Sequence, residues 1–297
     1  MPAIDVDPEV LRTVAAASAH AAEQAVWHID EEIKAASGDM QPLYDTLVAE
    51  GPYAYMVLPQ PQPDGTILLP RITTREEIVA AYEMIRGWSD LLEVIGLTEV
   101  RGSWYLFNDN ISRGRARGDH SAPISTHETL GLFPSGKDAG ITGELVWMRV
   151  PRESLGAPGE VSAIPDDHLA AREAVHAQYG RFLDGLRAND LDAVLEPLHD
   201  LVASTTRDYV ADTGTITDFS GKDVHRAYYE AYFARYDVRS VEVLTQVTED
   251  WFVFAELRIT VAPRAGGDAV AYNTAEFWVP SRDGRFIARI GHGTEQA

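Results

Sequence analysis

The sequence predicts an α+β protein built from two tandem copies of one fold. Three observations indicate this. The phrase LTEVRGSWYLF at residues 97–107 returns as LTQVTEDWFVF at residues 244–254, which is 147 positions later. A helix-start pattern precedes each phrase, and an alternating segment that breaks at Pro-Ser follows each phrase. Because the matches occur in the same order in both halves, we interpret the chain as a duplication.

The first half reads as helix, helix, strand, helix and then long antiparallel strands. Residues 7–36 are rich in alanine, and Pro8 stands where a helix tolerates proline, so a long first helix is expected. Residues 41–50 predict a short second helix. The motif TREE from Thr74 to Glu77 is a capping box that starts the third helix. The later strands are predicted at residues 97–107, 126–136 and 143–150.

The second half repeats this order. Residues 175–186 carry an apolar stripe at helical spacing, and the following Asn-Asp pair at 189–190 predicts a turn. The motif SGKD at 220–223, with Ser220 as the expected helix cap, stands 146 residues after the first capping box. Residues 273–284 parallel residues 126–136 and pair Glu276 with Glu128 at an offset of 148. The last strand is predicted at residues 284–291.

The domain boundaries follow from local composition. Residues 151–167 contain three prolines and two glycines, which is typical of a linker. We therefore expect a first domain at residues 1–150 and a second domain at residues 168–297.

Composition and charge exclude several classes of function. The formal net charge of −21 argues against nucleic acid and anionic membrane as partners, because both carry phosphate that this surface would repel. The absence of cysteine excludes disulfides and favours a cytoplasmic location. No apolar run is long enough to span a membrane. No metal-binding, phosphate-binding or dinucleotide-binding motif is present, so no cofactor is expected.

The order of elements resembles the nuclear transport factor 2-like superfamily, and within it the SnoaL-type, polyketide cyclase-like group. The segments that carry the resemblance lie mainly in the second half: the stripe around Tyr179, RANDLDAVLEPL at 187–198, GKDVHRAYYEAYFARY at 221–236 and RDGRFIARIGHG at 282–293. The resemblance implies that each half is a cone-shaped α+β barrel of cystatin-like type. In such a cone a curved antiparallel sheet wraps a long helix and encloses a hydrophobic pocket. It further implies an intramolecular pseudo-dimer, with a homo-oligomer left open.

Strand alternation separates the expected pocket face from the outer face. In the second half the pocket face is apolar at alternate positions from Trp251 to Ile259. At the corresponding positions of the first half stand Asn108, Asn110 and His127, and a buried polar group needs a hydrogen-bonding partner. We predict His127 as a general base and the two asparagines as hydrogen-bond donors. The alternatives are asparagines at a solvated rim and a structural histidine.

Other side chains are candidates for substrate binding because they could reach a cone interior. They are Tyr55, Tyr82 and Trp104 in the first half and Tyr228 and Asn273 in the second half. Packing in an aromatic core is the competing role for the tyrosines and the tryptophan.

The function expected from the resemblance is that of a cofactor-independent enzyme. It would use general acid–base chemistry on an apolar cyclic or polyketide/terpenoid-like substrate, as an isomerase, dehydratase, cyclase or epoxide hydrolase. The second cone would then be mainly a scaffold. The alternative is a non-catalytic module that binds a hydrophobic ligand or supports assembly.

Overall fold

The computed structural model describes residues 28, 39–47, 56–57, 60–62, 67–70, 72–135, 140–149, 167–207, 216–281 and 283–293. The chain divides into two compact units. The first comprises residues 1–58 and 70–148, and the second comprises residues 59–69 and 149–297. The expected linker, apart from Asp167, and the expected first helix, apart from His28, lie outside the described residues.

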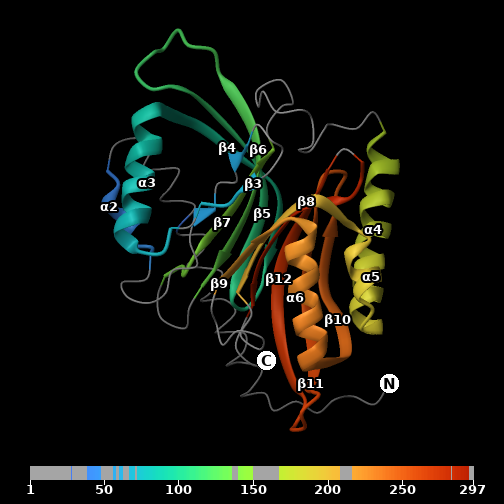
Figure 1. Cartoon of the computed structure of the whole chain (residues 1–297). Coiled ribbons are helices and arrows are strands. Elements are labelled where there is room, and N and C mark those ends of the chain that lie inside the picture. The colour runs from blue at the N-terminus through green and yellow to red at the C-terminus, as the bar shows by residue number, and fades with distance from the viewer. Residues whose placement is uncertain are drawn as a thin grey trace, which may run out of the picture. The chain divides into compact units, whose positions relative to one another are not determined.

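The first unit contains two described helices and a five-stranded sheet (Figure 1). The helices are α2 (Gln41–Tyr44) and α3 (Arg75–Trp88). The strands are β1 (Met56–Val57), β4 (Ser89–Arg101), β5 (Tyr105–Ala116), β6 (Ser125–Pro134) and β7 (Glu144–Arg149). Their order in the sheet is β1-β7-β6-β5-β4, and β1 runs parallel to β7.

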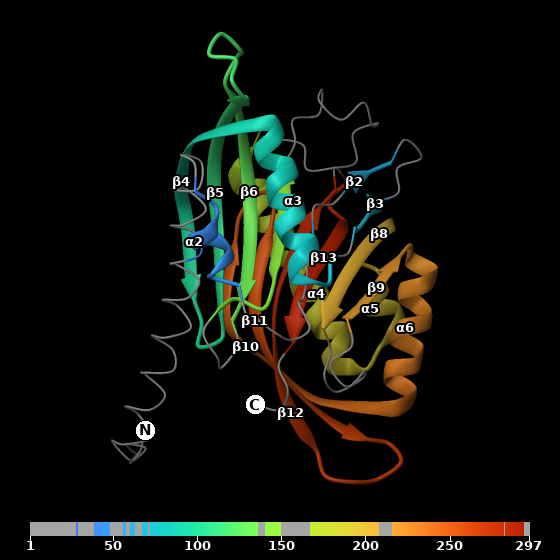
Figure 2. The ribbon, with the colours of Figure 1, turned by 90° about the vertical axis from the view of Figure 1, so that its left-hand side faces the viewer.

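The second unit contains three described helices and a six-stranded sheet, seen from a second side in Figure 2. The helices are α4 (His168–Ala188), α5 (Leu191–Leu195) and α6 (Lys222–Arg235). The strands are β8 (Leu198–Arg207), β9 (Ile216–Ser220), β10 (Tyr236–Thr248), β11 (Val253–Pro263), β12 (Val270–Pro280) and β13 (Phe286–Gly293). A short hairpin of β2 (Gln60–Pro61) and β3 (Ile67–Leu68) also belongs to this unit.

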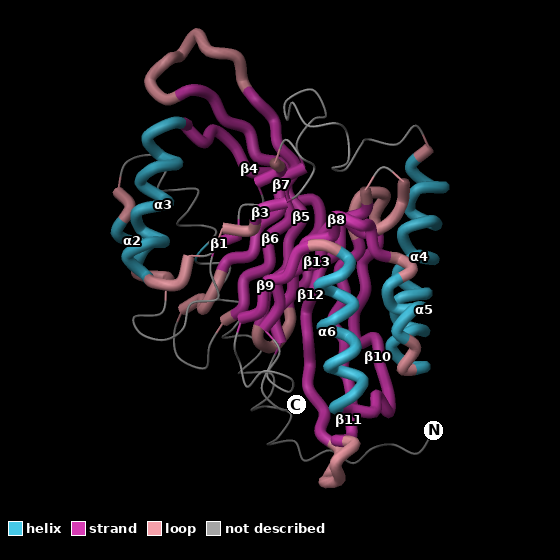
Figure 3. The backbone as a smooth tube through the Cα atoms, in the orientation of Figure 1, coloured by secondary structure: helices cyan, strands magenta, loops and turns pink. Residues whose placement is uncertain are grey.

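The two sheets follow the same order. The order β10-β11-β12-β13-β8 repeats β4-β5-β6-β7-β1, including the parallel pairing of the last two strands. The strands of both sheets are the magenta segments in Figure 3. The long edge strands also bend at the same places: β4 has register shifts at Leu91/Glu93 and Gly96/Thr98, and β10 has them 147 residues later. β-Bulges bend and twist a strand, so they curve both sheets at equivalent points. Within the described residues neither sheet closes into a barrel, because β4 and β10 each have one neighbour.

The helix ends are set by local chemistry. Thr74 caps α3 with the predicted capping box, in which the Thr74 hydroxyl accepts from the Glu77 amide and the Glu77 carboxylate accepts from the Thr74 amide. The prediction for α6 was wrong, because the cap is Gly221 and not Ser220. Gly221 has a φ of 86°, which a residue with a side chain rarely adopts. Asn189 ends α4 in the left-handed conformation, at the predicted turn.

Each unit has its own apolar core. In the second unit, α4, α5 and α6 pack on alternate residues of the sheet, including Val253, Ala255, Leu257 and Ile259 as predicted. In the first unit, α2 and α3 pack on β5 and β6 through a smaller set of side chains, among them Leu106. The described residues contain no helix with the length and hydrophobicity needed to cross a membrane.

The strand register corrects one predicted equivalence. Asn108 lies opposite Gly131 in the first sheet, whereas Ala255, the counterpart of Asn108, lies opposite Glu276. The pairing of Glu276 with Glu128 was therefore wrong, and Gly131 is the structural counterpart of Glu276. The cause is the turn before β6, which is two residues longer than the turn before β12.

Candidate functional site

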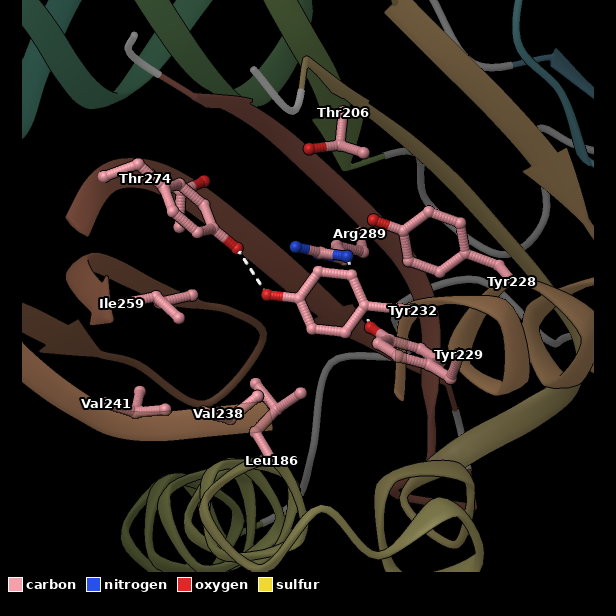
Figure 4. A pocket seen from close by; sticks show the side chains of 11 residues that line it. Leu186, Thr206, Tyr228, Tyr229, Tyr232, Val238, Val241, Ile259, Thr274 and Arg289 are labelled. Carbon is pink, nitrogen blue, oxygen red and sulfur yellow. Dashed lines mark hydrogen bonds between the residues drawn. The ribbon is translucent and has the colours of Figure 1, made fainter. Parts of the chain in front are cut away.

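The second unit holds a pocket between α6 and the inner face of its sheet (Figure 4). Its cavity volume is about 30 Å³, which is room for about two water molecules. Four tyrosines dominate the lining, which is completed by four aliphatic side chains and three polar ones. The lining residues are Tyr228, Tyr229, Tyr232, Tyr272, Leu186, Val238, Val241, Ile259, Thr206, Thr274 and Arg289. We call this cavity the tyrosine pocket.

Helix α6 supplies three of the four tyrosines. Tyr228, Tyr229 and Tyr232 share one face of α6 because residues one and four positions apart lie close together around the helix. The hydroxyl of Tyr232 lies 2.9 Å from the hydroxyl of Tyr272 on β12. Tyr228 is half-buried, whereas the other three are buried, so Tyr228 is the most accessible of the four rings.

A β-bulge places Arg289 in the pocket. Phe286 packs into the core, so simple alternation would put Ala288 on the inner face and Arg289 on the outer face. The register shifts between Phe286 and Ala288, and Arg289 consequently lies opposite Trp278 on the inner face. Its guanidinium carbon stands 5.3 Å from the centre of the Trp278 ring.

Glu276 is the charge partner of Arg289. Oε2 of Glu276 accepts from Nε of Arg289 at 3.0 Å and from Nη2 at 2.7 Å. Oε1 of Glu276 accepts from the hydroxyl of Tyr179 at 3.1 Å and from the indole N–H of Trp278 at 2.8 Å. Nη1 of Arg289 donates to the hydroxyl of Tyr229 at 3.2 Å. Both carboxylate oxygens therefore have two donors each, and no lone carboxylate faces the pocket from this position.

Burial and charge decide the ionisation of this network. Burial alone would lower the pKa of the Arg289 guanidinium, but the carboxylate of Glu276 holds that pKa well above its usual value. Burial, together with the charge of Glu276, raises the pKa of the Tyr179 hydroxyl well above its usual value. Arg289 is therefore charged and Tyr179 neutral at physiological pH.

A buried serine–histidine pair lies beside the pocket. Oγ of Ser204 lies 2.7 Å from Nε2 of His225, and Nδ1 of His225 lies 2.9 Å from the carbonyl oxygen of Gly221. A carbonyl only accepts, so Nδ1 carries the proton and Ser204 donates to Nε2. Burial, aided by the charge of Arg289 and opposed by the bond to Gly221, lowers the pKa of His225 to about 4. Both side chains are almost completely buried, so the pair joins β8 to α6.

The structure brings together part of the predicted site in the first unit. Asn108 and Asn110 are two residues apart on β5 and therefore share one face of the sheet. His127 on β6 lies opposite Ser112, the next residue of β5 on that face, so it shares the face too. Nδ2 of Asn110 donates to Oδ1 of Asn108 at 3.3 Å, and Gly131 leaves the space that this amide fills. His127 is half-buried and makes no hydrogen bond to either asparagine, and its Nδ1 is buried without a partner among the described residues.

A buried polar cluster that the sequence analysis missed surrounds Tyr82. The hydroxyl of Tyr82 donates to Glu144 on β7 and lies 3.2 Å from Nε2 of His28. The other ring nitrogen of His28 lies 2.5 Å from the hydroxyl of Thr46, which itself donates to the carbonyl of Leu43 at 2.6 Å. Tyr82 therefore has a polar role in this core as well as an apolar one.

The remaining predicted residues lie in different surroundings. Tyr228 lines the tyrosine pocket. Trp104 precedes β5 and contacts the ring of Tyr105 edge-on, with the ring centres 4.9 Å apart. Asn273 lies opposite Arg258 on the outer face of the sheet and reaches Glu256, so it does not belong to the pocket. Tyr55 lies outside the described residues.

Two sequence signals could have indicated the pocket. The segment AYYEAYFARY concentrates tyrosines on one helix, and three of them reach the cavity. Glu276 and Arg289 each interrupt an apolar strand pattern, and such charges pair when they are buried. The bulge before Arg289 gave no comparable signal.

The family comparison concerns the second unit. Residues 179–289 match the SnoaL-like domain, so the second half of the chain contains a SnoaL-like domain. This range runs from the buried Tyr179 to the pocket residue Arg289. No curated protein sequence matches the chain.

Several solved structures resemble part of the chain. An LEH-like epoxide hydrolase of M. tuberculosis has 16% identity and a TM-score of 0.34, covering 41% of this chain and 84% of that chain. An NTF2-like protein of unknown function from Burkholderia pseudomallei has 16% identity and a TM-score of 0.36, and the match covers 41% of this chain and 91% of that chain. A conserved protein from Planctomyces limnophilus has 19% identity and a TM-score of 0.34, and the match covers 43% of this chain and 99% of that chain.

Proposed function

Starting from a SnoaL-like domain at residues 179–289, we propose that this chain binds a small, largely apolar organic molecule in the tyrosine pocket. The observation that carries the proposal is the lining itself. Four tyrosine rings and four aliphatic side chains surround one charged group, Arg289. Ligand sites combine apolar walls with a few polar groups that fix orientation, and this lining has that composition.

The pocket supports binding more directly than catalysis. Among the described residues the lining includes no carboxylate and no histidine, so none of these residues is an obvious general base. Glu276 is fully hydrogen-bonded, and the nearby His225 is held neutral and faces Ser204. The hydrophobic-ligand-binding alternative is therefore the function that this geometry supports best.

Acid–base catalysis is the second candidate, and one observation favours it. Arg289 and the tyrosine hydroxyls are donors that could stabilise an enolate or alkoxide oxygen, as isomerase, dehydratase, cyclase or epoxide hydrolase chemistry requires. The proton acceptor would have to be the substrate itself, a water molecule or a residue beyond the described lining. Turnover of a ligand found by binding would support this candidate.

A ligand screen tests the proposal. Thermal unfolding would be followed with cyclic ketones, epoxides and small cyclic acids, because a ligand that binds only the folded state raises its stability. The variant Ile259→Phe, which fills the pocket, should abolish the stabilisation. The control Val243→Phe places the same ring on the neighbouring strand at a site that is 38% exposed. Equal stabilisation of both variants would show that the ligands bind elsewhere.

A further inference from the structure

Arg289 has hydrogen-bonding capacity that its contacts with the described residues do not use. A guanidinium carries five N–H groups. Two of them, on Nε and Nη2, are donated to Glu276, and one on Nη1 is donated to Tyr229. One N–H group on Nη1 and one on Nη2 remain, on a side chain that is 9% exposed and lines the pocket.

The position of these two donors follows from the planarity of the guanidinium. Nε and Nη2 share the edge that holds Glu276, so the second N–H of Nη2 points along the adjacent edge, beside Nη1. Figure 4 shows the guanidinium among the rings of Tyr228, Tyr229 and Tyr232. A carboxylate accepts short, charge-assisted hydrogen bonds from guanidinium N–H groups.

The surroundings favour an anion over a cation. Every side-chain polar group of the lining, whether tyrosine, threonine or arginine, can donate a hydrogen bond, and none is anionic. Glu276 is the carboxylate that contacts Arg289, and both of its oxygens are occupied by donors. An incoming anion would therefore meet donors rather than an exposed negative charge.

We propose that the tyrosine pocket takes a small cyclic monocarboxylate, whose carboxylate accepts from the remaining N–H groups of Arg289 and whose ring packs on Val238, Val241 and Ile259. This inference rests on the proposed function and narrows its ligand to one chemical class. The cavity volume of about 30 Å³ holds the head group and not the ring, so the ring must displace a side chain.

The test compares acids with their esters on the unaltered protein. Calorimetric titration would use benzoate and cyclohexanecarboxylate beside methyl benzoate and methyl cyclohexanecarboxylate. Each ester keeps the ring of its acid but lacks the negative charge and the two equivalent oxygens of the carboxylate. The acids should bind about tenfold or more tightly than the esters, as expected for loss of a charge-assisted hydrogen-bonded pair.

Variants test whether the preference for acids over esters depends on Arg289. Arg289→Lys keeps the charge but removes the planar fork, so the acid-to-ester ratio should fall towards one. Arg239→Lys makes the same exchange at a site whose side chain is 62% exposed, and the ratio should not change. If Arg289→Lys does not fold, Ile259→Phe serves instead, because it should abolish binding of acid and ester alike.

The outcomes separate the two proposals. If the esters bind as tightly as the acids, the carboxylate inference is wrong while the apolar pocket stands. If the acids bind more tightly but the preference survives Ile259→Phe, the anion site lies elsewhere and the inference is also wrong. If no acid or ester binds while other apolar ligands do, the inference fails alone. If nothing in the wider screen binds, both proposals fail.

Discussion

Tyr82 and Tyr229 occupy equivalent positions on α3 and α6, and each hydrogen-bonds a charged side chain on the last long strand of its own sheet. The charges are opposite: Tyr82 donates to the carboxylate of Glu144, and Tyr229 accepts from the guanidinium of Arg289. The two halves thus share a scaffold and differ in the polarity of the core. We expect anion binding in the second unit and not in the first.

The buried pair of Glu276 and Arg289 should be costly to break. Glu276→Gln leaves the Arg289 guanidinium buried without its counter-charge, so the free energy of unfolding should fall by about 3–5 kcal/mol. The double variant Glu276→Met with Arg289→Met removes the unpaired charge but leaves the Tyr179 hydroxyl and the Trp278 indole N–H without their acceptor, so it should recover only part of this loss. Urea unfolding followed by circular dichroism measures both. As a control, Arg226→Met breaks an exposed ion pair with Asp192 and should cost about 1 kcal/mol or less.

His225 should make the second unit sensitive to acid. Its pKa is about 4 when folded, and an unfolded histidine has a pKa of about 6.5. The unfolded chain therefore binds the proton first, and stability falls as pH drops from about 6.5 to about 4, by roughly 3 kcal/mol for this residue. Urea unfolding across this range should show a shallower pH dependence in His225→Gln. An unchanged slope would mean that other groups cause the acid sensitivity.

Two glycines of α4 should respond oppositely to alanine. A Cβ at Gly180 would meet no atom within 4 Å, so Gly180→Ala should stabilise the unit by about 1 kcal/mol through helix propensity. A Cβ at Gly185 would lie 2.6 Å from the backbone nitrogen of Val194, so Gly185→Ala should destabilise it. Thermal unfolding of both variants checks the approach of α5 to α4. Similar shifts would contradict that close contact.

The predicted role of His127 can be tested through stability as well as activity. Because Nδ1 of His127 is buried without a partner, His127→Leu should leave the free energy of unfolding unchanged or raise it by about 1 kcal/mol. His225→Leu removes two hydrogen bonds, to Ser204 and Gly221, and should destabilise the protein clearly. For a turned-over substrate, loss of activity in His127→Gln without loss of stability would support the general-base hypothesis. Destabilisation by His127→Leu would indicate a structural bond.

The sequence by itself determined the class of fold and much of its order. The repeated phrase correctly marked equivalent places in the two halves, but the prediction of one strand at residues 97–107 was wrong. The phrase covers the end of β4, a turn and the start of β5, and its copy covers the same parts of β10 and β11. The capping box at Thr74 and the turn at Asn189 were predicted because turn and cap residues act locally. The apolar inner face of β11 was also predicted, since burial of one face dictates the alternation.

Tertiary structure decided which charged residues meet. The longer turn before β6 shifted the register, so Glu276 faces the core while its counterpart is Gly131. The bulge between Phe286 and Ala288 turned Arg289 inward, although alternation predicted the opposite face. A single extra residue moves every later side chain of the strand to the opposite face of the sheet, and no local propensity signals where it occurs. The pairing of Arg289 with Glu276, and with it the pocket, therefore depended on strand registers that only the folded sheet fixes.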